Sequence, residues 1–119
     1  MPNLITTLKH RSDFLRLRRG SKTVTPYFIV RQAPTPSGMA AAGSVRVGYT
    51  VTAKCGNAVV RNRIKRRLRA VVRELFPAHA VPDHDYILIA LADVTPSAAD
   101  VPMAQLRAAM QRALAGRAR

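Results

Sequence analysis

The 119-residue sequence contains few residues of the kinds that cross-link small domains or bind metals, with one cysteine, Cys55, and three histidines. A lone cysteine cannot form an internal disulfide, and the usual zinc motifs need a second cysteine. Tryptophan is absent, and only three tyrosines and three phenylalanines are present. The hydrophobic content of 48% is still sufficient for one modest core. We therefore expect a single domain over residues 1–119.

Long apolar runs are also missing. The longest candidate, Tyr86 to Ala92, has the length of a strand and is far shorter than the ~18 apolar residues of a membrane-spanning helix. The first residues, Met1 to Thr6, have neither the basic region nor the apolar segment of a signal peptide. These features predict a cytoplasmic protein with no membrane partner and no obligate protein partner.

Acidic residues are scarce, because six Asp and Glu stand against 20 Lys and Arg and leave a net charge of +14. Such an excess in a chain of ordinary apolar content predicts a folded domain that binds a polyanion, with nucleic acid as the leading candidate. A metal-dependent protein nuclease needs several converging carboxylates. Asp83 and Asp85 are close in sequence, but capping and solvation at a loop-to-strand junction explain them. No catalytic residue and no metal ligand are predicted in the protein.

The hydrophobic pattern predicts six elements in the order α-β-β-α-β-α. Ser12 is the expected cap of the first helix, Asn57 caps the long helix, and Pro77 follows that helix after its end near Leu75. The first two strands are expected to pair as a hairpin across a mobile loop at 33–44, and residues 117–119 form a frayed tail. The result is an α+β fold, a two-layer α/β sandwich whose mixed sheet contains a βαβ unit and a central third strand. The elements are helix 12–19, strands 23–32 and 45–52, helix 58–75, strand 85–92 and a last helix from about 102 to 116.

The long helix after Asn57 carries seven cations and one acid, Glu74. At about 100° per residue, most of these cations lie opposite an apolar stripe. Like charges four residues apart repel, and cations in the first turns oppose the helix dipole. An ordinary solvated helix face mixes both signs of charge. The pattern therefore favours an anionic ligand over a merely exposed face.

The segment from Arg46 to Arg69 closely resembles the signature of the bacterial ribonuclease P protein component. Arg61-Asn62-Arg63 forms its most specific centre, after Gly56-Asn57-Ala58-Val59. Weaker similarity covers residues 8–20, the strand at Tyr86 and the last helix, which is nearly the whole chain. The resemblance implies a subunit that binds a catalytic RNA and helps it remove the 5′ leader of precursor tRNA. It also implies Mg²⁺ held mainly by the catalytic RNA, and a left-handed βαβ crossover in place of the usual right-handed one.

The resemblance also implies the contact residues. Positions that match the motif face the catalytic RNA, namely Lys54, Arg61, Asn62, Arg63, Lys65, Arg66 and Arg69. The single-stranded leader is expected in a cleft between the first helix and the sheet, with Phe14, Arg18, Phe28 and Arg31 as candidates. Some family members have aromatic residues at the two arginine positions, so leader contact here relies more on guanidinium stacking and charge. Phe14 and Phe28 can equally be core residues.

Two other functions fit a strongly basic domain. One is a ribosomal or other structural-RNA-binding protein with no role in cleavage, and the other is an autonomous nuclease. Basicity alone does not separate these possibilities. The context of Arg61-Asn62-Arg63 favours the ribozyme subunit over the first, and the lack of a carboxylate group disfavours the second.

Overall fold

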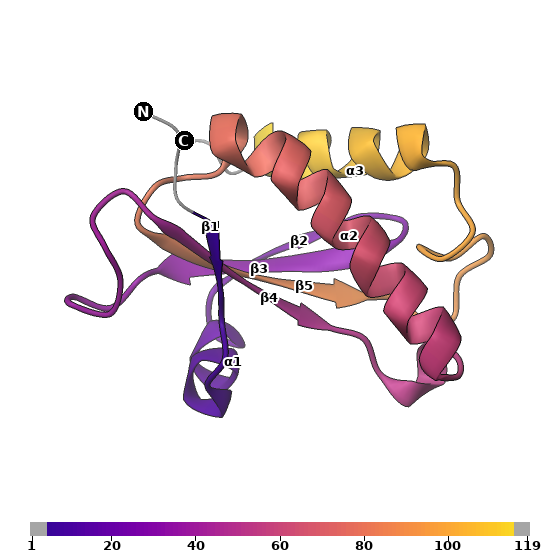
Figure 1. Cartoon of the computed structure of the whole chain (residues 1–119), viewed down its shortest axis with the longest axis horizontal. Helices are drawn as coiled ribbons and strands as arrows, with labels where there is room; N and C mark the ends of the chain where they lie inside the picture. The colour runs from indigo at the N-terminus through magenta and orange to yellow at the C-terminus, as the bar shows by residue number, and fades with distance from the viewer. Residues whose placement is uncertain (1–4, 116–119) are drawn as a thin grey trace.

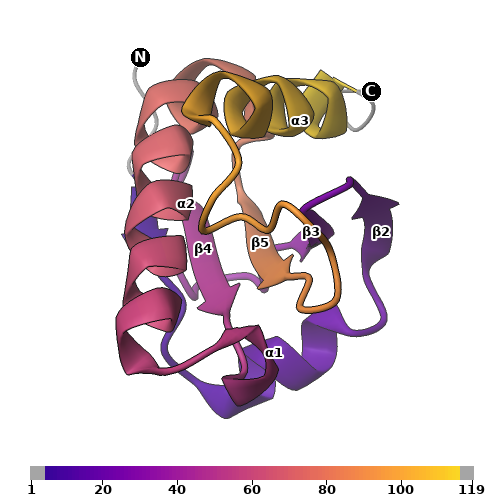
Figure 2. The same cartoon turned by 90° about the vertical axis from the view of Figure 1, so that its right-hand side faces the viewer.

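The computed structural model describes residues 5–115, in which a five-stranded mixed sheet carries helices on both faces (Figures 1 and 2). The α+β class and the mixed sheet are confirmed. The predicted tail at 117–119 and the helix end at 116 lie outside the described residues. The strands are β1 (Ile5–Thr7), β2 (Ser21–Val24), β3 (Phe28–Pro34), β4 (Val45–Thr50) and β5 (His84–Ala90). The helices are α1 (Arg11–Leu17), α2 (Ala58–His79) and α3 (Met103–Ala115), with a short 3₁₀ turn η1 (Ala53–Cys55) before α2.

The strands lie in the order β1-β4-β5-β3-β2. β4 runs parallel to β1 and β5, whereas β3 is antiparallel to β5 and β2. The central position of β5 confirms the prediction from its nearly continuous apolar run. The predicted hairpin between the first two long strands is wrong, because β5 lies between β3 and β4. β5 pairs with β3 along one edge and with β4 along the other, so these two strands cannot pair with each other.

The expected strand over 23–32 is two strands, β2 and β3, joined by a tight turn. Strand β1 was not predicted at all. Thr25 closes this turn, because its hydroxyl donates to the Phe28 carbonyl at 2.7 Å and accepts from the Phe28 amide at 3.0 Å. Pro26 occupies the turn itself, where its missing N–H removes no ladder hydrogen bond. The chain then returns with Ser21 opposite Gln32.

Two predicted helix boundaries also differ. Helix α1 begins at Arg11 after His10, with no side-chain capping bond, so Ser12 is inside the helix and does not cap it. Helix α2 begins as expected, since the Asn57 side chain accepts from the Val60 amide at 3.0 Å. It continues past Pro77 to His79 because that proline stands in the last turn, where only one intrahelical bond is lost.

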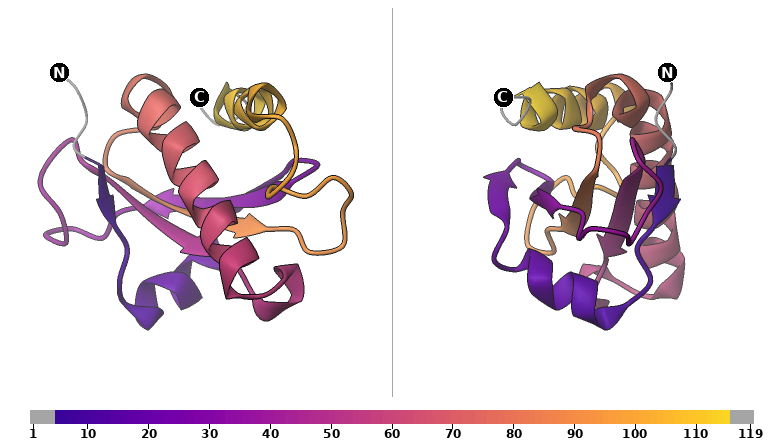
Figure 3. Two further views of the ribbon diagram at one scale, coloured as in Figure 1. Left: turned by 45° about the vertical axis from the view of Figure 1, so that its right-hand side comes forward. Right: turned by 90° about the vertical axis from the view of Figure 1, so that its left-hand side faces the viewer.

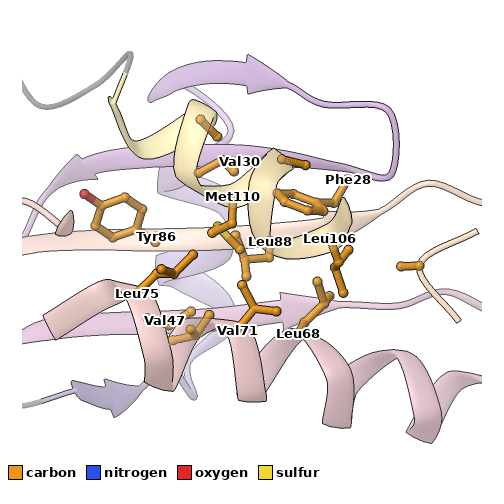
Figure 4. Packing of buried hydrophobic residues seen from close by; sticks show 14 of the residues in the cluster. Phe28, Val30, Val47, Leu68, Val71, Leu75, Tyr86, Leu88, Leu106 and Met110 are labelled. Carbon is orange, nitrogen blue, oxygen red and sulfur yellow. The ribbon is translucent and has the colours of Figure 1, made fainter. Parts of the chain in front are cut away.

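The main core lies between the sheet and the pair α2 and α3 (Figure 4). Successive side chains of a strand point to opposite faces of the sheet, so every second side chain of each strand faces these helices. The other face of the sheet carries α1 alone, over a smaller buried cluster of Leu8, Leu17 and Ile87. Figure 3 shows α1 on one side of the sheet and the two longer helices on the other. The predicted two-layer sandwich thus describes the main core, and α1 leaves part of the second face open. The main-core side chains include Phe28, Val30, Val47, Leu68, Val71, Leu75, Tyr86, Leu88, Leu106 and Met110.

The connection from β4 through α2 to β5 is the expected βαβ unit. In Figure 1, both strands run from left to right with α2 above them, and β4 is nearer to the viewer. The crossover is therefore left-handed, as the resemblance implies. The loop that precedes β4 is held at its base by Asp83, whose backbone bonds Thr35 and Ser44 at 2.9 Å each. Ala33 and Pro34 of the predicted loop belong to β3, so the loop covers only residues 35–44, and its mobility stays a prediction.

Candidate nucleic-acid interface

Helix α2 presents a basic face to solvent. Its apolar stripe is buried against the sheet and α3, which leaves the opposite side of the helix uncovered. Asn62, Arg63, Arg66 and Arg69 are exposed on that side, and Arg61 and Lys65 are half-buried at its edge. Lys54 is exposed in η1, immediately before the helix. All seven residues predicted to face RNA therefore lie on η1 and on α2 between Arg61 and Arg69.

Tyr49 of β4 supports this basic face from below. The guanidinium carbon of Arg69 lies 5.7 Å from the centroid of the Tyr49 ring, within cation–π distance. Burial raises the pKa of Tyr49 to about 12, against the opposing charges of Arg69 and Arg73, so the phenol is neutral at physiological pH. The aromatic ring thus fixes one arginine of the face without neutralising it.

Arg67 differs from the other cations of α2. Its guanidinium donates to the carbonyl of Ala98 at 2.6 Å and also to that of Val101. Burial, followed by the charge of Arg63, lowers the pKa of Arg67. This side chain holds the segment between β5 and α3, so it is a structural residue of the helix flank.

A cleft of about 730 Å³ lies on the other face of the sheet, beside α1. Its floor is apolar, from Phe14, Leu17, Ile87 and Ile89, and its cations come from α1, the residues before it and β3. A basic groove with surfaces for base stacking is the arrangement that binds single-stranded nucleic acid. The complete lining is Lys9, Arg11, Phe14, Leu17, Arg18, Arg31, Thr50, Ile87 and Ile89.

The Phe14 ring reaches this cleft because β4 has a glycine beneath it. A Cβ added to Gly48 would lie 2.7 Å from Cζ of Phe14, closer than real atoms approach. Phe14 itself is half-buried, so part of the ring remains available to a ligand. Three of the four predicted leader residues, Phe14, Arg18 and Arg31, therefore line one cleft.

The prediction for Phe28 is wrong. Its side chain is fully buried in the main core, on the face of the sheet that α2 and α3 cover (Figure 4). Because successive side chains of a strand point to opposite faces, Ile29 and Arg31 point to the other face of the sheet. Alternation within the predicted strand over 23–32 already separates these residues, so Phe28 and Arg31 could not both line one cleft.

The cleft also contains residues that the sequence analysis did not select. Lys9 and Arg11 flank the start of α1, and Ile87 and Ile89 come from the central strand. The two isoleucines were hidden in an apolar run that shows no alternation by itself. The alternating pattern of β4, which pairs with β5, was the available signal for which face they occupy.

A buried carboxylate, Asp85, lies beside the cleft, under the other flank of α1. Arg46 binds it bidentately, through Nε at 2.8 Å and Nη2 at 2.6 Å, and Thr35 donates to it at 2.7 Å. Arg16 donates to the same carboxylate. Burial alone would raise the pKa of Asp85, but the hydrogen bonds from Arg46, Thr35 and Arg16 outweigh it and lower the pKa below its ordinary value. The prediction that capping and solvation explain Asp85 is wrong, because the residue is fully buried and ion-paired.

Asp13 extends this cluster into α1. Its Oδ1 lies 3.3 Å from Arg16 and 3.4 Å from Arg46, and Oδ2 is buried without a hydrogen-bond partner among the described residues. The two buried carboxylates are therefore committed to arginines. Within residues 5–115, no group of three or more His, Cys, Asp or Glu side chains is placed to hold a metal ion.

A basic crossover helix on one face of a mixed sheet, with a basic, apolar-floored cleft on the other, is typical of a nucleic-acid-binding protein of the α+β class. The described helices include none that is long and apolar enough to cross a membrane. The family model for Ribonuclease P matches residues 5–117, so the chain belongs to the ribonuclease P protein family. The chain is thus a component of a tRNA-processing endoribonuclease that has an RNA partner.

Relatives agree in sequence and in structure. The chain is 43% identical over 108 residues to the ribonuclease P protein component of Paramagnetospirillum magneticum, covering 88% of this chain and 80% of the relative. It is 38% identical over 112 residues to that of Brucella suis, covering 91% and 77%. The solved ribonuclease P protein of Staphylococcus aureus superposes with a TM-score of 0.74 at 27% identity, over 93% of this chain and 94% of that one. The protein from Thermotoga maritima gives 0.75 at 26% identity, over 91% and 94%.

Proposed function

We propose that this protein binds the catalytic RNA of ribonuclease P through α2 and the 5′ leader of precursor tRNA through the cleft beside α1. It thereby assists the magnesium-dependent endonucleolytic removal of the leader, which makes the mature 5′ end of the tRNA. The observation that carries this proposal is the presence of two separate basic surfaces on opposite faces of one sheet, in a member of this family. Two surfaces allow one small protein to bind both RNAs at once.

The basic face of α2 suits a structured RNA. Arginine side chains bind phosphate oxygens bidentately, and clustered exposed cations displace counterions from a folded RNA. Asn62 lies between arginines and can both donate and accept, which suits a base edge or a ribose hydroxyl. Lys54 extends the same surface to η1.

The cleft suits an unpaired leader. Phe14 and the two isoleucines of the floor supply apolar surface for bases, and Arg18 and Arg31 can stack their guanidinium planes on them. Lys9 and Arg11 add charge for the phosphates at the start of α1. Mature tRNA lacks the leader, so contacts in this cleft discriminate substrate from product.

We assign the hydrolytic chemistry to the catalytic RNA, with Mg²⁺ held mainly by that RNA, and binding and orientation to the protein. The buried carboxylates support this division, since Asp13 and Asp85 are both bound by arginines. We expect the protein to act in the cytoplasm, where it would process precursor tRNA.

Cleavage of a 5′-extended precursor tRNA at low magnesium tests the proposal, with the protein alone, the cognate catalytic RNA alone, and the two together. We expect efficient cleavage at the mature 5′ end only in the mixture. Cleavage by purified protein alone would instead show a protein active site. A mixture that gains nothing over the RNA alone would favour a structural-RNA-binding protein with no role in cleavage.

A further inference from the structure

The buried ion cluster of Asp13, Arg16, Thr35, Arg46 and Asp85 connects α1 to three other segments of the chain. Asp13 and Arg16 come from α1, Arg46 from β4, Asp85 from β5, and Thr35 from the loop after β3. Arg16 also donates to the carbonyl of Pro34 at the end of β3, at 3.3 Å. None of the five side chains lines the cleft. The side chains of the cluster therefore do not contact a ligand bound in the cleft.

Helix α1 depends on contacts of this kind for its position. It has seven residues, and a helix of that length is not stable on its own. Its buried apolar contacts on this face come from a small cluster of Leu8, Leu17 and Ile87, with Phe14 packed beside it. So small a cluster leaves rotation of α1 about its own axis weakly restrained, unless the ion cluster restrains it.

The helical period places the ion cluster and the cleft on opposite flanks of α1. At 3.6 residues per turn, Asp13 and Arg16 lie about 60° apart on one flank, and Phe14 and Arg18 lie about 40° apart on the other. Leu17 lies between the two pairs and points to the sheet, where it is fully buried. Rotation about the Leu17 contact thus moves the ion cluster and the cleft wall together. With side-chain tips about 6 Å from the axis, a rotation of about 20° displaces Phe14 and Arg18 by about 2 Å.

We propose that the buried ion cluster positions α1 for binding of the single-stranded 5′ leader, with Arg16 and Asp85 as positioning residues. This inference rests on the proposed leader-binding role of the cleft. The sheet register supports it, because Arg46 pairs with Asp85 two residues before Gly48 pairs with Ile87, so the two pairs are neighbours on one face, and Phe14 lies over Gly48. The ion pair between Arg46 and Asp85 and the contact between Phe14 and Gly48 therefore lie next to each other on this face of β4 and β5.

Arg16→Met is the informative variant. Arg16 is partly exposed, and its loss leaves Asp85 bound by Arg46 and Thr35, so the protein should still fold. Arg107→Met is a matched control, because Arg107 forms an ion pair with Glu74 between α3 and α2, away from the cleft. Each variant removes one positive charge from a partly exposed arginine; Arg16→Met breaks the ion pairs to Asp13 and Asp85, and Arg107→Met breaks the pair to Glu74. Arg16→Lys keeps the charge and can restore one bond to Asp85.

The measurement is the affinity of the reconstituted holoenzyme for precursor tRNA and for mature tRNA, with the wild type, these three variants and Phe14→Ala. We expect Arg16→Met to weaken binding of precursor tRNA about tenfold, within the range for loss of one stacked base, and to leave mature tRNA unchanged. Arg107→Met should change neither affinity. Arg16→Lys should recover part of the loss. Hydrogen exchange should show faster exchange in α1 and unchanged exchange in α2 for Arg16→Met.

The other outcomes separate this inference from the proposed function. If Phe14→Ala weakens only precursor tRNA while Arg16→Met behaves like Arg107→Met, the cleft binds the leader and the positioning role is wrong. Equal weakening of both tRNAs by Arg16→Met would also overturn the positioning role, because it would indicate general destabilisation. If Phe14→Ala and the wild type show the same preference for precursor tRNA, the leader-binding role of the cleft fails first, and the inference fails with it.

Discussion

Alanine substitutions at Gly20 and Gly48 should have opposite consequences, although both place one methyl group beside the same helix. Neither glycine has a φ in the left-handed region, so alanine meets no backbone strain at either position. At Gly20, the new Cβ would lie 2.4 Å from the carbonyl oxygen of Gln32, a backbone atom of β3. At Gly48, it would lie 2.7 Å from Cζ of Phe14, the far end of a half-buried side chain.

The expected free energies follow from which atom has to move. Overpacking costs about 1–3 kcal/mol, and replacing glycine by alanine returns about 0.4–1 kcal/mol by restricting the unfolded chain. Gly20→Ala should lie at the upper end of this cost, because relief requires a shift of the pairing between Ser21 and Gln32. We therefore expect it to destabilise the protein by about 2 kcal/mol. Gly48→Ala should be close to neutral, because the Phe14 ring can swing away.

Urea unfolding followed by circular dichroism measures this difference. With a slope of about 2 kcal/mol per M, Gly20→Ala should lower the midpoint by about 1 M, and Gly48→Ala should leave it nearly unchanged. Gly48→Ala should nevertheless weaken binding of precursor tRNA relative to mature tRNA, since it displaces Phe14. A neutral Gly20→Ala would refute the close backbone approach, and a strongly destabilising Gly48→Ala would show that the Phe14 ring is fixed as part of the core.

Three further predictions concern the charged groups. Affinity for the catalytic RNA should fall about 10³- to 10⁵-fold between 50 and 200 mM salt if six to ten phosphates are contacted, and Arg66→Ala and Arg69→Ala should each reduce the salt slope by about one, measured by filter binding. Arg67→Met should leave that slope unchanged but lower the free energy of unfolding by about 1.5–3 kcal/mol, because it removes bonds to the carbonyls of Ala98 and Val101. The pKa of Asp85 is lower in the folded than in the unfolded protein, so its contribution to stability is complete above about pH 4 and is lost as the pH falls through the folded pKa. The free energy of unfolding, measured with urea as a function of pH, should therefore fall less steeply in acid for Asp85→Asn than for the wild type. An equally steep fall would contradict this prediction.

The parts of the fold that could be predicted are those determined by residues close together in the sequence. The stripe that includes Ile64, Leu68 and Val72 fixed the buried face of α2, and the Asn57 cap fixed its start. The exposed cations of that helix were equally visible, because a helical period assigns them to one side without knowledge of the partner. The same reasoning found Phe14 as a candidate but could not choose between cleft and core.

The parts that could not be predicted depend on contacts between distant residues. Alternation separates Phe28 from Arg31, but which of their two faces α2 and α3 cover depends on the pairing of β3 with β5, as of Phe28 with Ala90. The burial of Asp85 requires Arg46 from β4 and Arg16 from α1, which are 39 and 69 residues away. A carboxylate at a strand start looks solvated until those partners are known. The insertion of β5 between β3 and β4 has the same origin, since a short loop favours a hairpin whereas burial of β5 does not.

Strand β4 shows how one short segment serves both RNA-binding surfaces. Gly48 lies under the Phe14 ring on the cleft side, and the next residue, Tyr49, lies under Arg69 on the side of α2. Because successive residues of a strand point to opposite faces, the supports of the two surfaces are adjacent in sequence and separated by the thickness of the sheet. A change at Gly48 therefore reaches the cleft proposed for the leader, and a change at Tyr49 reaches the face proposed for the catalytic RNA. The segment from Arg46 to Arg69 therefore combines the glycine under Phe14, the tyrosine under Arg69 and the first part of the helix that carries the basic face.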